Sequence, residues 1–173
     1  EIDPKFREMG ARLFAYGRDC GSPQWRMGDG RLILDAEAKA GADPYDALIV
    51  DAFQNLHPPV HLLTREAMEV YRARLKPQGL LIVNLTSFYY DFFPQMAAQA
   101  QALGWQMWVH DLPHHGLTTR WAVMAPSDVD LRWLEKEGWR FYPPQGDRVW
   151  TDDLADPLSA LNSLAWLRQL LNK

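Results

Sequence analysis

The hydrophobic positions of this chain alternate between segments with helical spacing and short uninterrupted apolar runs. The clearest helical pattern spans residues 62–79, LLTREAMEVYRARLKPQG, where Thr64 is a suitable N-cap and Pro77–Gly79 is expected to end the helix. Its apolar positions are Leu63, Ala67, Val70, Tyr71 and Leu75. Further helices are expected at 4–17, 30–40, 91–103, from Ser127 and from Asp156.

The apolar runs predict strands near residues 24–28, 46–51, 80–86, 105–111 and 118–125. The run DALIVD, 46–51, is bounded by aspartates and is typical of a parallel strand that is buried on both faces. We expect the first three strands to be parallel, whereas the last two follow each other closely and indicate an antiparallel edge.

This strand–helix alternation predicts an α/β fold, a three-layer sandwich with a mostly parallel sheet. A length of 173 residues suits one domain, residues 1–173. In such sheets, ligands bind beyond the carboxyl ends of the strands, so the residues at those ends are the first candidates for a site.

Composition narrows the function classes. The chain is 47% hydrophobic and 23% charged, which is typical of a globular protein, and no apolar run approaches the length of a membrane span. A net charge of −4 argues against a nucleic-acid partner, which usually requires a basic surface. The single Cys20 excludes a disulfide framework and suits a reducing, cytoplasmic environment.

Acidic residues follow the expected strand ends. Glu1 and Asp3 open the chain in a pattern that resembles the end of a strand, Asp29 follows QWRMG, and Asp51 follows DALIV. One such acid alone is usually a helix cap or a turn residue. Together they suggest an adenosine site, because a carboxylate can accept bonds from both ribose hydroxyls and Gly30 leaves room for a ring beside Asp29.

The ordered segments EIDP, GDGR and YDALIVDAF resemble the spermidine synthase-like proteins, the polyamine aminopropyltransferases. The stretches VHLLTREAMEVYRARLKPQGLLIVNLTS and VWTDD are similar to the bacterial branch of that group. The resemblance runs from Glu1 to about Leu154 and implies the Rossmann-like fold of class I S-adenosylmethionine-dependent methyltransferases.

The resemblance also implies roles for individual residues. Glu1 would bind the ribose hydroxyls with support from Asp3, while Asp29 and Gly30 would hold the adenine. Asp51 would be the base that orients and deprotonates the attacking amine. The co-substrate would be S-adenosylmethionine or its decarboxylated form, with no tightly bound cofactor, and the acceptor a small amine.

Two departures from the family pattern affect these expectations. Where the aminopropyltransferases have a second acid three residues after the base, this chain has Gln54, an amide that can bind an amine without supplying charge. The first strand and its glycine-rich loop are missing, so we expect Glu1 to end the second strand of a domain truncated on its N-terminal side. The chain as given should then bind a nucleoside weakly and be inactive.

Three functions stay open: an aminopropyltransferase, a methyltransferase of the same fold, and a non-catalytic nucleoside-binding or scaffold module. Subunit assembly is also open, with a homodimer as one option. His110, His114 and His115 match no metal-site spacing, so no metal is expected. The TDD segment, 151–153, could contact substrate or cap a helix.

Overall fold

The computed structural model describes residues 1–13, 24–52, 59–114 and 117–162. The chain divides into two compact units, Glu1–Asp43 and Pro44–Lys173, and each is considered by itself. The expectation of a single domain over 1–173 therefore stays a prediction.

The first unit contains the helices α1 (Pro4–Leu13) and α3 (Gly30–Lys39). No strand forms at residues 24–28, so that prediction is wrong. The terminal amino group of Glu1 nevertheless donates to the carbonyl of Arg26 (3.0 Å), and the Glu1 carbonyl accepts the N–H of Gly28 (2.9 Å), which is the bonding pattern of parallel strands. The pairing rests on Glu1 alone, and one residue is too short to form a ladder.

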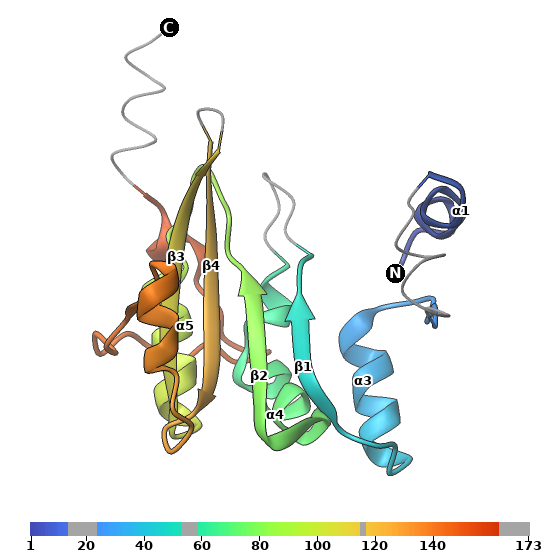
Figure 1. Ribbon diagram of the computed structural model, residues 1–173, viewed down its shortest axis with the longest axis horizontal. Coiled ribbons are helices and arrows are strands. Elements are labelled where there is room, and N and C mark those ends of the chain that lie inside the picture. Colours follow the sequence, from blue (N-terminus) through green and yellow to red (C-terminus); the bar gives the residue numbers. More distant parts are fainter. Residues whose placement is uncertain (14–23, 53–58, 115–116, 163–173) are drawn as a thin grey trace, which may run out of the picture. The chain divides into compact units, whose positions relative to one another are not determined.

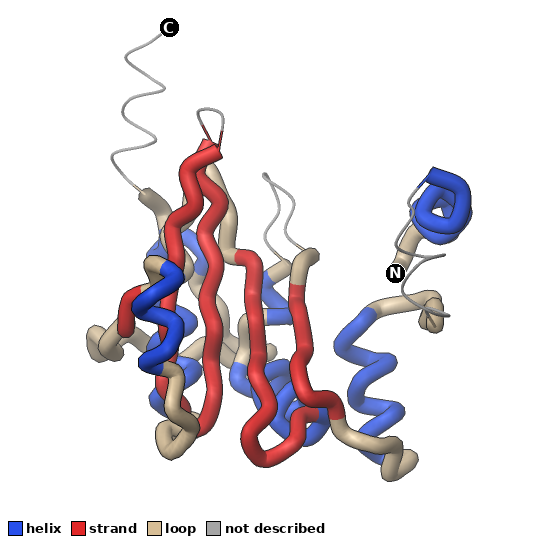
Figure 2. Tube along the Cα trace, in the orientation of Figure 1, coloured by secondary structure: helices blue, strands red, loops and turns tan. Residues whose placement is uncertain are grey.

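The second unit is built on a five-stranded sheet with the order β1-β2-β4-β3-β5. Figures 1 and 2 show these strands, which are β1 (Tyr45–Val50), β2 (Leu75–Asn84), β3 (Trp105–His114), β4 (Leu117–Pro126) and β5 (Arg140–Phe141). β1 and β2 are parallel, as predicted, and β3 and β4 form the expected antiparallel pair. β2 with β4 and β3 with β5 are also antiparallel, so the parallel part is smaller than the sequence indicated.

Helices cover both faces of this sheet, which gives the predicted mixed α/β architecture. α4 (Arg65–Arg74) and α5 (Phe93–Ala102) lie on one face, and the 3-10 helix η2 (Arg132–Glu137) lies on the other (Figure 1). Side chains alternate accordingly along β3: Trp108 packs with Leu131 and Leu134 beside η2, while Met107 and Val109 are buried on the opposite face. Two short 3-10 helices, η1 (Val60–Leu62) and η3 (Pro157–Ala160), complete the described elements.

Three sequence expectations for this unit need correction. α4 ends at Arg74, before the expected stop at Pro77–Gly79, because Leu75 already pairs with Tyr45 as the first residue of β2. β1 is not buried on both faces, since it is an edge strand whose Ile49 is 61% exposed. The helix expected from Ser127 begins only at Arg132, and both it and the helix expected from Asp156 are short 3-10 helices in the described part of the chain. Thr64 does cap α4, because its hydroxyl accepts the N–H of Ala67 (3.4 Å).

A C-terminal segment fastens the two helices α4 and α5 together. The fully buried Gln99 of α5 donates through Nε2 to the carbonyls of Leu63 (3.0 Å) and Trp150 (2.9 Å). The Trp150 carbonyl also accepts the N–H of Arg65 (2.8 Å). The indole ring of Trp150 packs edge-on against the ring of Phe92. One amide side chain therefore supplies partners for two backbone carbonyls that are far apart in sequence.

We predict that Gln99→Met lowers the free energy of unfolding by about 2 kcal/mol, because both carbonyls lose a donor in a buried place. The measurement is urea unfolding of the whole chain. Gln101→Met, at an exposed position of the same helix, is the matched control and should change the stability by less than about 0.5 kcal/mol. Equal stability of the two variants would contradict this role of Gln99.

The end of η2 is fixed by a close contact with β3. Gly138 follows the helix with a φ of 83°, and the preceding carbonyl, of Glu137, lies 3.0 Å from Nε2 of His110. The imidazole also contacts the ring of Trp139 edge-on. A Cβ added to Gly138 would lie 2.9 Å from His110 Nε2, so the position requires glycine for its conformation and for its space.

Gly138→Ala should therefore destabilise the protein more than Gly104→Ala does, by about 1 kcal/mol. Gly104 has a similar φ of 70°, but a Cβ there would meet nothing within 4 Å. The comparison separates backbone strain, which both variants share, from displacement of His110. Thermal unfolding of the two variants measures the difference. Equal melting temperatures would show that the His110 side chain can move away from the new methyl group without loss of stability.

Candidate active site

The structure gives two of the predicted site acids a capping role in the first unit. Asp29 accepts the N–H of Leu32 through Oδ1 (3.1 Å) and is the N-cap of α3. Asp3 likewise accepts the N–H of Lys5 (2.8 Å) at the start of α1. A capping carboxylate uses one oxygen to accept a helix N–H. Its second oxygen is not engaged by the cap, so the capping role does not decide whether the residue binds a ligand.

Glu1 lies beside the segment that leads to Asp29. Its backbone is bonded to Arg26 and Gly28, and its Oε1 accepts the N–H of Asp3 (2.8 Å). A Cβ on Gly30 would meet nothing within 4 Å, so no contact in the described chain requires glycine there. The first unit thus brings the backbone of Glu1 next to the segment before Asp29.

Asp51 belongs to the second unit, directly after β1. It is exposed, and its Oδ1 accepts a hydrogen bond from the side-chain amide of Asn84 (2.7 Å). Asn84 is the last residue of β2, and parallel strands end at the same edge of a sheet, which explains how the two side chains meet. Gln54, the predicted amine-binding residue, lies outside the described residues.

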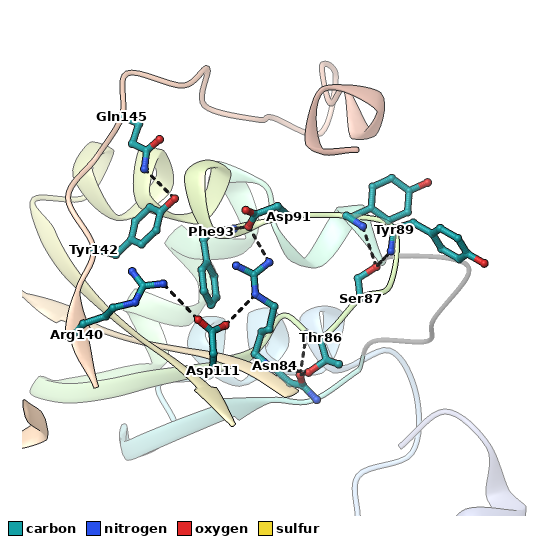
Figure 3. Close-up of polar contacts among 12 residues, drawn as sticks. Asn84, Thr86, Ser87, Tyr89, Asp91, Phe93, Asp111, Arg140, Tyr142 and Gln145 are labelled. Carbon is teal, nitrogen blue, oxygen red and sulfur yellow. Dashed lines mark hydrogen bonds and ion pairs between the residues drawn. The ribbon is translucent and has the colours of Figure 1, made fainter. Parts of the chain in front are cut away.

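Asn84 is itself held by Thr86. Its Oδ1 accepts both the backbone N–H (2.9 Å) and the hydroxyl (2.5 Å) of Thr86. The same hydroxyl oxygen accepts the N–H of Arg120 in β4 (2.9 Å). Figure 3 shows Asn84 and Thr86 turned toward each other where the chain leaves β2. Asp51 is therefore connected to the neighbouring strand through two polar side chains.

The Arg120 side chain contacts three further segments. Its guanidinium bonds to Asp91 (2.9 Å), in the loop before α5, and to Asp111 (3.1 Å) in β3. It also lies over the Phe93 ring, 3.9 Å from the centroid. Arg140 of β5 contacts the second oxygen of Asp111 (3.4 Å). The four charges balance, so this cluster fixes the loops rather than presenting a net charge.

Tyr142 lies next to this cluster, with its ring against Phe93. Burial, with a smaller contribution from the negative charge of Asp91, raises the pKa of Tyr142 above its ordinary value of 10.0. Its hydroxyl oxygen accepts a bond from Gln145 (2.9 Å). Tyr142 consequently keeps its proton at neutral pH and can act only as a neutral hydrogen-bonding group.

Sequence reasoning selected Asp51 but missed its partners. Asn84 and Thr86 end the predicted strand 80–86, and the criterion applied to acids, polar groups at strand ends, would have found them. Arg120 gave no such signal, because it lies inside a strand pattern and its partners Asp91 and Asp111 come from other segments.

The remaining candidates have structural contacts. In the TDD segment, Asp152 accepts the hydroxyl of Thr64 (2.7 Å) and so supports the start of α4. His110 packs at the end of η2, whereas His115 lies outside the described residues. In the described parts of the chain no group of three or more His, Cys, Asp or Glu side chains could hold a metal ion. The same parts contain no helix long and apolar enough to cross a bilayer.

Comparison with known sequences supports the resemblance. The chain is 32% identical over 93 residues to a polyamine aminopropyltransferase of Vibrio vulnificus, covering 53% of this chain and 30% of that protein. It is 31% identical over 85 residues to a probable polyamine aminopropyl transferase of Bifidobacterium longum, covering 49% and 18%. The matches thus span less than a third of these curated relatives. No family model matches the chain.

Solved structures share the fold. A probable spermidine synthase from Corynebacterium glutamicum aligns with a TM-score of 0.61 at 15% identity, covering 90% of this chain and 63% of the other. The spermidine synthase from Thermotoga maritima gives 0.56 at 13% identity, covering 99% and 58%. Human methyltransferase-like protein 13, solved in complex with SAH, gives 0.56 at 21% identity, covering 79% and 64%. In sequence the chain is similar to polyamine aminopropyltransferases, and its Rossmann-like, methyltransferase-type fold is similar to that of solved spermidine synthases.

Proposed function

We propose that this protein transfers an aminopropyl group from decarboxylated S-adenosylmethionine to a polyamine acceptor of the putrescine type. The observation that carries the proposal is the placement of Asp51. It follows the first of two parallel strands, it is exposed, and its Oδ1 is fixed by Asn84 at the end of the second strand. The sequence similarity to two curated aminopropyltransferases supplies the reaction class.

Aminopropyl transfer needs a proton acceptor beside the attacking amine, and the carboxylate of Asp51 can supply it. An aliphatic amine is mostly protonated near neutral pH, so it must lose a proton before it can attack. Asp51 attracts the cationic acceptor and takes that proton. The amine nitrogen then forms a bond to the aminopropyl carbon beside the sulfonium, and the carbon–sulfur bond breaks. Its electron pair stays on sulfur, which leaves as a neutral thioether, and the positive charge passes to the nitrogen of the new secondary amine, so charge and atoms balance.

We propose that residues of the first unit bind the nucleoside part of the donor. The carboxylate of Glu1 would accept hydrogen bonds from the ribose hydroxyls. The backbone N–H of Asp3 donates to Oε1 of Glu1 and would hold that carboxylate in place. Asp29 and Gly30 would contact the adenine, where the open space beside Gly30 suits a flat ring. The donor would be a co-substrate that leaves after each turnover, and no metal takes part.

We predict that Asp51→Asn in the full-length protein lowers kcat by about 10²–10⁴, because it removes the proton acceptor and keeps the size of the side chain. The Kd for methylthioadenosine should change less than twofold. The assay is product formation from decarboxylated S-adenosylmethionine and, separately, from S-adenosylmethionine, with putrescine and spermidine as acceptors.

Asp46→Asn is the matched control, since Asp46 is an exposed residue of the same strand that pairs with Lys76 (2.6 Å). It should leave kcat unchanged. Transfer from S-adenosylmethionine alone would replace the proposal by a methyltransferase. No transfer from either donor by the wild-type protein would favour a non-catalytic module. Wild-type turnover by Asp51→Asn would exclude Asp51 as the base.

A separate prediction concerns Gln54. If the acceptor is a diamine, Gln54→Asp should lower its KM about tenfold, because the substitution adds a negative charge for the cationic acceptor. Methyl transfer to a neutral acceptor would gain nothing from that charge. Initial rates over a range of putrescine concentrations distinguish the two cases, and an unchanged KM would contradict polyamine recognition at this position.

A further inference from the structure

The hydrogen bonds that lead to Asp51 have a fixed direction. A backbone N–H can only donate, so the hydroxyl oxygen of Thr86 must be the acceptor in its bond with the N–H of Arg120 (2.9 Å). The hydrogen of that hydroxyl is then free to donate to Oδ1 of Asn84 (2.5 Å). The direction of the first bond thus determines the second.

Thr86 also decides which way the amide of Asn84 points. Oδ1 of Asn84 accepts two donors from Thr86, the hydroxyl and the backbone N–H (2.9 Å). A flipped amide would place its NH₂ group against both of these donors, which is unfavourable. The amide nitrogen is therefore directed at Asp51, to whose Oδ1 it donates (2.7 Å).

The chain of bonds begins where β2 and β4 separate. Their paired register ends with Asn84 opposite Trp121, and one more backbone bond follows, from the N–H of Leu85 to the carbonyl of Arg120 (2.7 Å). The hydroxyl of Thr86 then takes the place of the next carbonyl as acceptor for Arg120. Because the Arg120 side chain is held by Asp91 and Asp111, this starting point is fixed at both its backbone and its side chain.

We infer that Thr86 is a positioning residue for Asp51. It does not touch the reacting atoms, but it orients Asn84, which in turn holds Oδ1 of Asp51 and leaves Oδ2 as the oxygen that receives the proton of the amine. The inference rests on the proposed function and adds to it a specific requirement, a hydroxyl at position 86.

Three variants of the full-length protein test this requirement. Thr86→Val removes the hydroxyl at nearly constant size, so kcat should fall at least about tenfold, with less than a twofold change in the KM of the sulfonium donor. Thr86→Ser keeps the hydroxyl and should retain kcat within about threefold. Thr119→Val, which removes a weakly bonded hydroxyl from β4 (3.5 Å to a carbonyl), is the matched control and should not change kcat.

A double variant shows whether Thr86 acts through Asp51. In the Asp51→Asn background, Thr86→Val should lower kcat by less than twofold, because the group that it positions is already lost. A full additional tenfold loss would overturn the inference, and so would a Thr86→Ser variant as slow as Thr86→Val. Thr86→Ala replaces Thr86→Val if the latter does not fold.

A second readout needs no activity, so the two proposals can fail separately. In NMR spectra, the side-chain amide of Asn84 should exchange its hydrogens with solvent at least about tenfold more slowly in the wild type and Thr86→Ser than in Thr86→Val. If no donor reacts, the proposed function fails while this comparison still decides the hydrogen-bond chain. Equal exchange in all three proteins would overturn the role of Thr86.

Discussion

The parallel pairing of β1 and β2 is the constraint on which the candidate site depends. Val50 lies opposite Val83 in this register, so the next residues on the two strands are Asp51 and Asn84. A slip of one residue would turn every side chain of β1 to the other face and separate the carboxylate from its amide partner. The apolar residues of the two strands, through their register, thus determine where Asp51 is placed.

Beyond the last backbone hydrogen bond between β2 and β4, side chains make the hydrogen bonds that connect the neighbouring segments. Thr86 replaces a carbonyl as the acceptor for β4, and Arg120 joins the loop before α5 to β3 through Asp91 and Asp111. Both carboxylates are about 40% exposed, so each ion pair contributes modest stability in water, but their shared guanidinium fixes the geometry of the loops. A rim built in this way holds its polar groups in defined directions without burying a net charge.

The sequence allowed prediction of the features that depend on local patterns. The helix cap at Thr64, the hairpin of β3 and β4 and the acid after β1 all follow from neighbouring residues. Predictions failed where a residue distant in sequence determines whether a helix or strand forms or ends. α4 stops at Arg74 because Leu75 pairs with β1, and residues 24–28 form no strand because their pairing involves Glu1 alone. The Arg120 cluster was not predictable for the same reason, since its members come from different segments.

The contacts of the C-terminal segment have a consequence for synthesis of the chain. The first turn of α4 is completed by Trp150 and Asp152, and the bond from Thr64 to Asp152 spans 88 positions. During translation, α4 emerges long before these partners exist, so the N–H of Arg65 and the hydroxyl of Thr64 stay hydrated until the C-terminal segment is made. Domains generally fold as units when their last segments appear, and contacts of this separation are slow to form. Stalling the ribosome before residue 150 is released would therefore leave the start of α4 without its contacts to Trp150 and Asp152, and Gln99 with only one of its two carbonyl partners.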